Sequence, residues 1–198
     1  ALAAMGVVSK SAQFFVMPIM GMVMSAQPII GYNYGAHKYD RVKKAFKLAA
    51  VASTVYLTAF WAPLEIFPGP IISLFGLVKK DVVAVAQKAL RIYLLMMPII
   101  GFQMVGSNYF QATGQPAKSA ILTLSRQVIL LIPLILCAPL IAHAMGMSAD
   151  KQLIAIVFAA PISDLISTCL TTTFVIRELR KLDRKHEAVE AGENPALA

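Results

Sequence analysis

The sequence predicts an all-α fold, a polytopic membrane helix bundle with about five full transmembrane helices. Of its 198 residues, 58% are hydrophobic and only 14% are charged, whereas soluble domains carry about 45–50% apolar and about 25% charged residues. The apolar residues gather in five runs, each near the ~20 residues that cross a bilayer as a helix. Lysine and arginine fall in short bursts between these runs. The alternative, a very apolar soluble helical domain, is disfavoured by the lengths of the runs.

The five predicted spans are 12–34, 45–67, 86–112, 119–142 and 152–176. The first becomes polar in its second half, where Gln27 and Asn33 lie. The second follows the basic connector HKYDRVKK. The third is the least regular, because Lys88 and Arg91 lie in its first turns. The fourth and fifth each carry one charge, and residues 177–198 form a tail that is basic and then acidic.

The distribution of lysine and arginine predicts the orientation of the spans. One set of flanks holds twelve of the 18 basic residues, and the opposite set holds six. The richer set comprises Lys38, Arg41, Lys43, Lys44, Lys47, Lys118, Arg126, Arg177, Arg180, Lys181, Arg184 and Lys185. Because cytoplasmic loops carry the excess of positive charge, we expect the first span to run inward and the C-terminal tail to be cytoplasmic.

Two classes of function are disfavoured by composition and motifs. A net charge of +8 suggests nucleic-acid binding in a soluble protein, but here the charges flank membrane spans, so we expect no nucleic-acid partner. The sequence has no Gly-rich phosphate loop, no nucleophile elbow and no metal-spaced histidines or cysteines. We therefore expect neither an enzyme nor a metal site, and no cofactor.

Prolines recur inside or near the ends of the predicted spans. Each removes a helical hydrogen bond and tends to kink its helix, and such breaks survive in membranes where a neighbouring helix or a cavity satisfies the backbone. Transmembrane helices also tolerate proline more than soluble helices do. Their number favours a transporter with bent helices around a cavity. These prolines are Pro18, Pro28, Pro63, Pro98, Pro133, Pro139 and Pro161.

A polar stripe follows the third span. Gln103, Ser107 and Gln111 stack on one helical face, and Asn108 lies beside them. The stripe indicates either a helix–helix contact or an aqueous path, and the sequence does not separate the two, because Asn and Gln also join helices within bundles.

Two charges lie inside the last two spans. Asp164 is at the centre of 152–176, where a carboxylate needs a partner, a proton or water. Arg126 lies about 10 Å from the inner end of its span and Asp164 about 18 Å from the same side, at 1.5 Å per residue. Because the two spans are consecutive and antiparallel, we expect an Arg126–Asp164 contact inside the bundle. The alternative is that Arg126 extends to the interface.

Three stretches in this order resemble the C-terminal half of multidrug and toxic compound extrusion (MATE) transporters, nearest to the bacterial MepA-like branch. They are AQPIIGYNYGAHKYDRVKKAFK, YFQATGQPAKSAILTLSRQVILLIPLIL and APISDLIS. The resemblance implies that residues 1–176 are a partial C-terminal transmembrane lobe of a six-helix design, with the N-terminal lobe missing. It also implies a multi-pass protein of the bacterial cytoplasmic membrane that exchanges cationic amphipathic drugs for protons or sodium ions.

The candidate residues of a substrate and ion pathway are the polar ones within the spans: Gln27, Tyr32, Asn33, Gln103, Asn108, Arg126 and Asp164. The third span carries no acid in its interior, where sodium-coupled members of the family use one, so the coupling ion stays open between proton and sodium. Two alternatives remain. One is a truncated membrane fragment that does not transport, and the other is half of a lipid-linked saccharide flippase of the same superfamily.

Overall fold

The computed structural model describes residues 2–66, 88, 91–144, 146 and 149–191. Its elements are α1 (Leu2–Gly35), α2 (Tyr39–Ile66), α5 (Met97–Ala112), α6 (Pro116–Leu124), the π-helix η1 (Ser125–Leu131), α7 (Ile132–Ala144) and α8 (Ala149–Glu190). These described parts contain helices and no strand, so the predicted all-α class is confirmed. Most of the connector between the second and third predicted spans lies outside the described residues.

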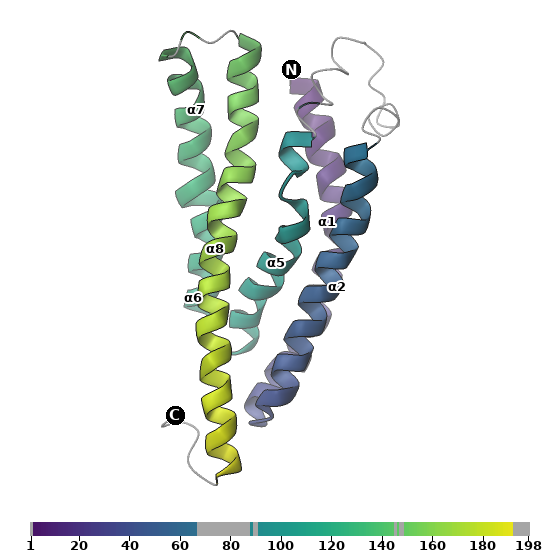
Figure 1. The fold of residues 1–198 in the computed structure, drawn as a ribbon, viewed down its shortest axis with the longest axis vertical. Coiled ribbons are helices and arrows are strands. Elements are labelled where there is room, and N and C mark those ends of the chain that lie inside the picture. The colour runs from purple at the N-terminus through teal and green to yellow at the C-terminus, as the bar shows by residue number, and fades with distance from the viewer. Residues whose placement is uncertain (1, 67–87, 89–90, 145, 147–148, 192–198) are drawn as a thin grey trace.

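The helices form an elongated bundle with α5 at its centre (Figure 1). α5 contacts α1 and α2 on one side and α8 on the other. α6, η1 and α7 follow one another as a single rod, and α8 returns antiparallel along it. The α1–α2 connection and the C-terminal end of α8 lie at one end of the bundle, and the C-terminal end of α7 and the N-terminal end of α8 lie at the other. The basic stretches 38–47 and 177–185, which are both predicted to face the cytoplasm, therefore lie at the same end of the bundle.

The helix ends differ from the predicted spans in three places. α1 already begins at Leu2, ten residues before the predicted start. The third predicted span is not one helix, because a turn at Leu95 and Met96 separates residues 91–94 from α5. Pro98 lies in the first turn of α5, where a missing N–H does no harm, so it marks the start of a helix and not a kink. α8 passes the predicted end at residue 176 without interruption and continues to Glu190.

Three stretches in the part of the chain that the structure describes are long and apolar enough to cross a membrane, by length and composition alone. They are Tyr39–Pro63, Pro116–Ile141 and Ala155–Glu190. The last has 36 residues, or about 54 Å of helix, which exceeds the ~30 Å of a bilayer core. Its segment from Arg177 onward carries basic residues at a higher density than the part before it, so we expect this segment to be the part that extends beyond a bilayer.

Small residues let the central helices approach closely. A Cβ added to Gly101 of α5 would lie 2.9 Å from the backbone of Ser53 on α2, and one added to Gly106 would lie 2.6 Å from Thr171 on α8. Both distances are shorter than van der Waals contact. Without a hydrophobic driving force between helices in lipid, such close packing is a main source of association. Gly101 and Gly106 therefore fix α5 between α2 and α8.

Candidate functional site

A strip of polar side chains runs along the inner face of α8. Ser163, Ser167 and Thr171 recur every four residues and lie on one face, with Asp164 beside them. All four are nearly inaccessible, at 1%, 0%, 0% and 4% exposure respectively. Polar groups at this depth require partners, and the neighbouring helices supply some of them.

Arg126 of η1 is the partner of Asp164. Its Nε donates a hydrogen bond to Asp164 Oδ1 at 2.6 Å, and the two side chains form an ion pair. The Asp164 side chain is 6% exposed and the Arg126 side chain 30%. The predicted contact between these residues is confirmed. The Asp164 side chain is thus enclosed, while the Arg126 side chain is partly exposed.

The π-helix η1 shapes the backbone around Arg126. The amide of Ile132 bonds to the carbonyl of Gln127, five residues earlier, as expected for a π-helix. Ser163 Oγ donates to the backbone carbonyl of Arg126 at 2.8 Å. α8 therefore contacts Arg126 twice, through its side chain and through its backbone. Short π segments within α-helices are frequent at functional sites.

Gln103 connects α5 to the same strip. Its Nε2 donates a short hydrogen bond to Ser167 Oγ, and the side chain is buried. The side-chain oxygen of Gln103, Oε1, has no hydrogen-bond partner among the described residues, and the same holds for Thr171 Oγ1. The strip thus offers one free acceptor and one free hydroxyl close to the α5–α8 contact.

The other predicted pathway residues lie apart from this strip. Asn108 Nδ2 donates to Gln27 Oε1 at 3.3 Å and so joins α5 to α1. Asn33 is buried, but its amide donates to the carbonyl of Ile29 on its own helix at 2.8 Å. Tyr32 is 74% exposed. Of the two explanations for the polar stripe, the observed bonds of Gln103 and Asn108 favour helix–helix contact.

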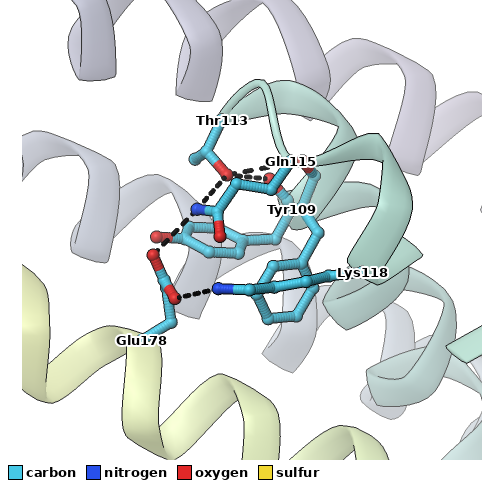
Figure 2. Close-up of polar contacts among 6 residues, drawn as sticks. Tyr109, Thr113, Gln115, Lys118 and Glu178 are labelled. Atoms are coloured by element: carbon cyan, nitrogen blue, oxygen red, sulfur yellow. Dashed lines mark hydrogen bonds and ion pairs between the residues drawn. The ribbon is translucent and has the colours of Figure 1, made fainter. Parts of the chain in front are cut away.

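A second polar cluster ties the α5–α6 connection to α8 (Figure 2), and we call Gln115, Lys118 and Glu178 the Glu178 cluster. Gln115 Nε2 donates to Glu178 Oε1 at 2.8 Å, and Lys118 Nζ donates to Oε2 at 3.0 Å. Burial favours the neutral acid and raises the pKa of Glu178, but these two hydrogen bonds and the charge of Lys118 outweigh burial and hold the pKa below its ordinary value of 4.5. Glu178 is therefore ionised at neutral pH.

The Glu178 cluster was not predicted from the sequence. Lys118 is one of the basic residues that flank the predicted spans, and Gln115 lies between the predicted spans 86–112 and 119–142. Gly114 has a φ of 73°, a left-handed conformation that glycine adopts readily, and it turns the chain at Gln115. The available signal was the position of an acid, Glu178, directly after Arg177 in a basic run that also contains Asp183.

Comparison with known proteins identifies the family. A family model described as MatE matches residues 1–137. The chain belongs to the MatE family. Its members are transporters and not enzymes, which agrees with the absence of catalytic motifs noted above.

Among the relatives of this MatE chain is an FAD transporter of Shewanella oneidensis (strain MR-1), 28% identical over 138 residues, which are 68% of the chain and 29% of the relative. The solved MATE multidrug transporter DinF-BH, in complex with R6G, is 34% identical with a TM-score of 0.75. That match covers 87% of this chain and 36% of the transporter. An inward-facing multidrug resistance MATE transporter of the MOP superfamily shares the fold, with a TM-score of 0.79 at 18% identity over 92% of this chain and 40% of that one. The chain thus spans about a third of the length of the relatives it matches.

Proposed function

We propose that this chain is the C-terminal lobe of a secondary multidrug transporter that exchanges cationic amphipathic drugs for protons or sodium ions. The observation that carries the proposal is the enclosed Arg126–Asp164 ion pair between η1 and α8. Membership of the MatE family and similarity to a MATE multidrug transporter support the substrate class. The placement within the MepA-like branch rests on the three sequence motifs alone.

The ion pair supplies a chemical basis for coupling. An ionised carboxylate in the membrane interior is stable only with a counter-charge, and Arg126 is that counter-charge here. A proton or a cation that reaches Asp164 competes with Arg126 and releases the guanidinium. Because α8 also holds the backbone carbonyl of Arg126 through Ser163, such a release changes the contact between η1 and α8. A change in this contact is the local step that accompanies the rocking of one lobe against another.

The proposed orientation places the C-terminus in the cytoplasm of a bacterial inner membrane. It is supported by the excess of lysine and arginine at the end of the bundle that holds the α1–α2 connection and the end of α8. The proposed extent of the lobe is 1–176, with the basic-then-acidic segment 177–198 as a cytoplasmic extension. The partners that follow are the lipid bilayer, drug cations and an N-terminal lobe.

Transport of a flavin nucleotide is the second candidate, because the similarity to the FAD transporter covers 68% of the chain. The Arg126 side chain is 30% exposed, and a guanidinium binds phosphate groups well. This candidate predicts that FAD inhibits dye export by competition, whereas the multidrug proposal predicts that an excess of FAD leaves dye export unchanged.

The proposal is tested by the export of a cationic fluorescent dye from bacterial cells. The cells express the chain alone, or the chain together with an N-terminal lobe taken from a MATE multidrug transporter. We expect dye accumulation to fall only when both lobes are present. Equal export by the chain alone would overturn the assignment as one lobe of a transporter. No export by the assembled pair would favour the alternative of a fragment that does not transport.

A further inference from the structure

A groove lies at the proposed cytoplasmic end of the bundle, away from the Arg126–Asp164 pair. Its volume is 580 Å³, and residues of α2, α5 and α8 line it. This volume is within the ~300–1,000 Å³ typical of ligand sites. Most of the lining comes from one face of α2, where Lys43, Lys44, Lys47, Val51 and Val55 follow at helical spacing.

The groove is charged at one end, where three lysines outnumber one acid, Asp40, in the lining, and it is apolar beyond that end. Lys44 and Lys47 lie within the first turns of α2, close to the α1–α2 connection. From Lys47 to Val55 the helix rises by about 12 Å, and Val51, Val55 and Phe102 of α5 line that part. A ligand that fills the groove must therefore be charged at one end and apolar along its length.

Two of the three lysines are available to an anion. Lys43 pairs with Asp183 of α8. Lys44 pairs with Asp40 at 3.2 Å, but both side chains are largely exposed, at 79% and 57%, and exposed ion pairs are easily exchanged. Lys47 is exposed and has no ion pair with any residue that the structure describes. Lys44 and Lys47 are thus the positive charges that face a ligand.

We propose that this groove binds an anionic phospholipid, with its phosphate on Lys44 and Lys47 and an acyl chain along Val51 and Val55. The charge at the membrane surface and the apolar wall toward the bilayer interior match the two ends of such a lipid. Basic pockets between helices on the cytoplasmic side are suited to anionic head groups. A drug cation is repelled by the lysines, and a soluble phosphate leaves the apolar wall unused. The inference requires that the chain lies in a bilayer but not that it transports.

The test uses quenching of tryptophan fluorescence by brominated lipids. The chain contains one tryptophan, Trp61, so Trp61→Phe provides a silent background in which Val51→Trp places a reporter in the groove. Val51 is 52% exposed, and Val128→Trp, at a position 50% exposed on η1, is the matched reporter away from the lysines. Both are reconstituted in phosphatidylcholine with increasing fractions of brominated phosphatidylglycerol, or of brominated phosphatidylcholine as reference.

We expect the groove reporter to prefer phosphatidylglycerol over phosphatidylcholine by about five-fold for each facing lysine, and the Val128 reporter to show a ratio near one. Lys44→Gln combined with Lys47→Gln should bring the groove ratio close to one. Lys38→Gln is the control, because Lys38 lies in the same basic stretch but does not line the groove. Circular dichroism checks that every variant is folded.

Two results would overturn the proposal. Equal quenching by the two lipids at the groove reporter, unchanged by the lysine substitutions, would show that the lysines select no anion. Quenching by neither lipid at the groove reporter, while the Val128 reporter is quenched normally, would show that protein covers the groove, either from a second copy or from a further lobe.

Discussion

Replacing Arg126 with glutamine should destabilise the bundle strongly, and replacing Asp164 with asparagine should do so less. The difference follows from burial, since the Asp164 side chain is 6% exposed and the Arg126 side chain 30%. Arg126→Gln leaves an enclosed carboxylate without its counter-charge. Breaking a buried pair in this way costs about 3–5 kcal/mol.

Asp164→Asn leaves a charge on a side chain that is 30% exposed, and this charge is less enclosed than that of Asp164. The asparagine oxygen can also accept the Nε–H of Arg126, now as a neutral acceptor. A hydrogen bond to a charged group contributes about 1.5–3 kcal/mol and one between neutral groups about 0.5–1.5, so the expected loss is about 1 kcal/mol. The double variant removes both charges and should be more stable than Arg126→Gln alone.

Unfolding of the chain by SDS in mixed micelles, followed by circular dichroism, measures these differences. Arg180→Gln is the control, because Arg180 lies on α8, as Asp164 does, and is exposed. This substitution should change the free energy of unfolding by less than about 0.5 kcal/mol. If the two single substitutions cost the same and their effects add in the double variant within about 0.5 kcal/mol, the ion pair has no coupling energy. That outcome would refute the reasoning.

Two further predictions concern packing and pH. Gly101→Ala should destabilise the chain by about 1–3 kcal/mol, because the new Cβ meets the backbone of Ser53 at 2.9 Å. Gly21→Ala is the control and should be neutral or stabilising, because a Cβ at Gly21 has nothing within 4 Å. Equal effects of the two substitutions in the SDS assay would contradict the close α2–α5 contact. Glu178→Gln should cost about 1–3 kcal/mol at pH 7. Because the folded pKa of Glu178 is lowered, its contribution is present above pH 4.5 and fades as the pH falls through the folded pKa. Stability curves for Glu178→Gln and the wild type should therefore converge in acid, and a constant difference at all pH values would argue against an ionised Glu178. Lys118→Gln should reproduce part of the loss.

The fold could be predicted from sequence because membrane spans depend on composition over about 20 residues. The Arg126–Asp164 contact could be predicted for a similar reason, since two charges in consecutive apolar spans have few other partners. The ends of the helices were less predictable. The break at Leu95 and Met96 and the continuation of α8 to Glu190 depend on tertiary packing and on local backbone geometry.

The remaining contacts of the site depend on which way each helix faces, and the sequence does not determine this. Asn33 and Tyr32 are polar residues in a predicted span, yet one bonds to its own helix and the other is exposed. The π-helix η1 has no sequence signal in SRQVILL comparable to a proline or glycine. The Glu178 cluster joins residues that are 60 and 63 positions apart in the sequence, so local patterns do not contain it.

The central claim is that Asp164, held by Arg126, couples ion movement to export. The most direct test measures dye transport driven by a pH gradient in proteoliposomes that contain this chain assembled with an N-terminal lobe. Asp164→Asn should lower the pH-driven rate at least about ten-fold while the assembled protein remains folded. Asp183→Asn, the matched change at a half-exposed acid on the same helix, should leave the rate unchanged. Transport by Asp164→Asn at the wild-type rate would remove Asp164 from the mechanism.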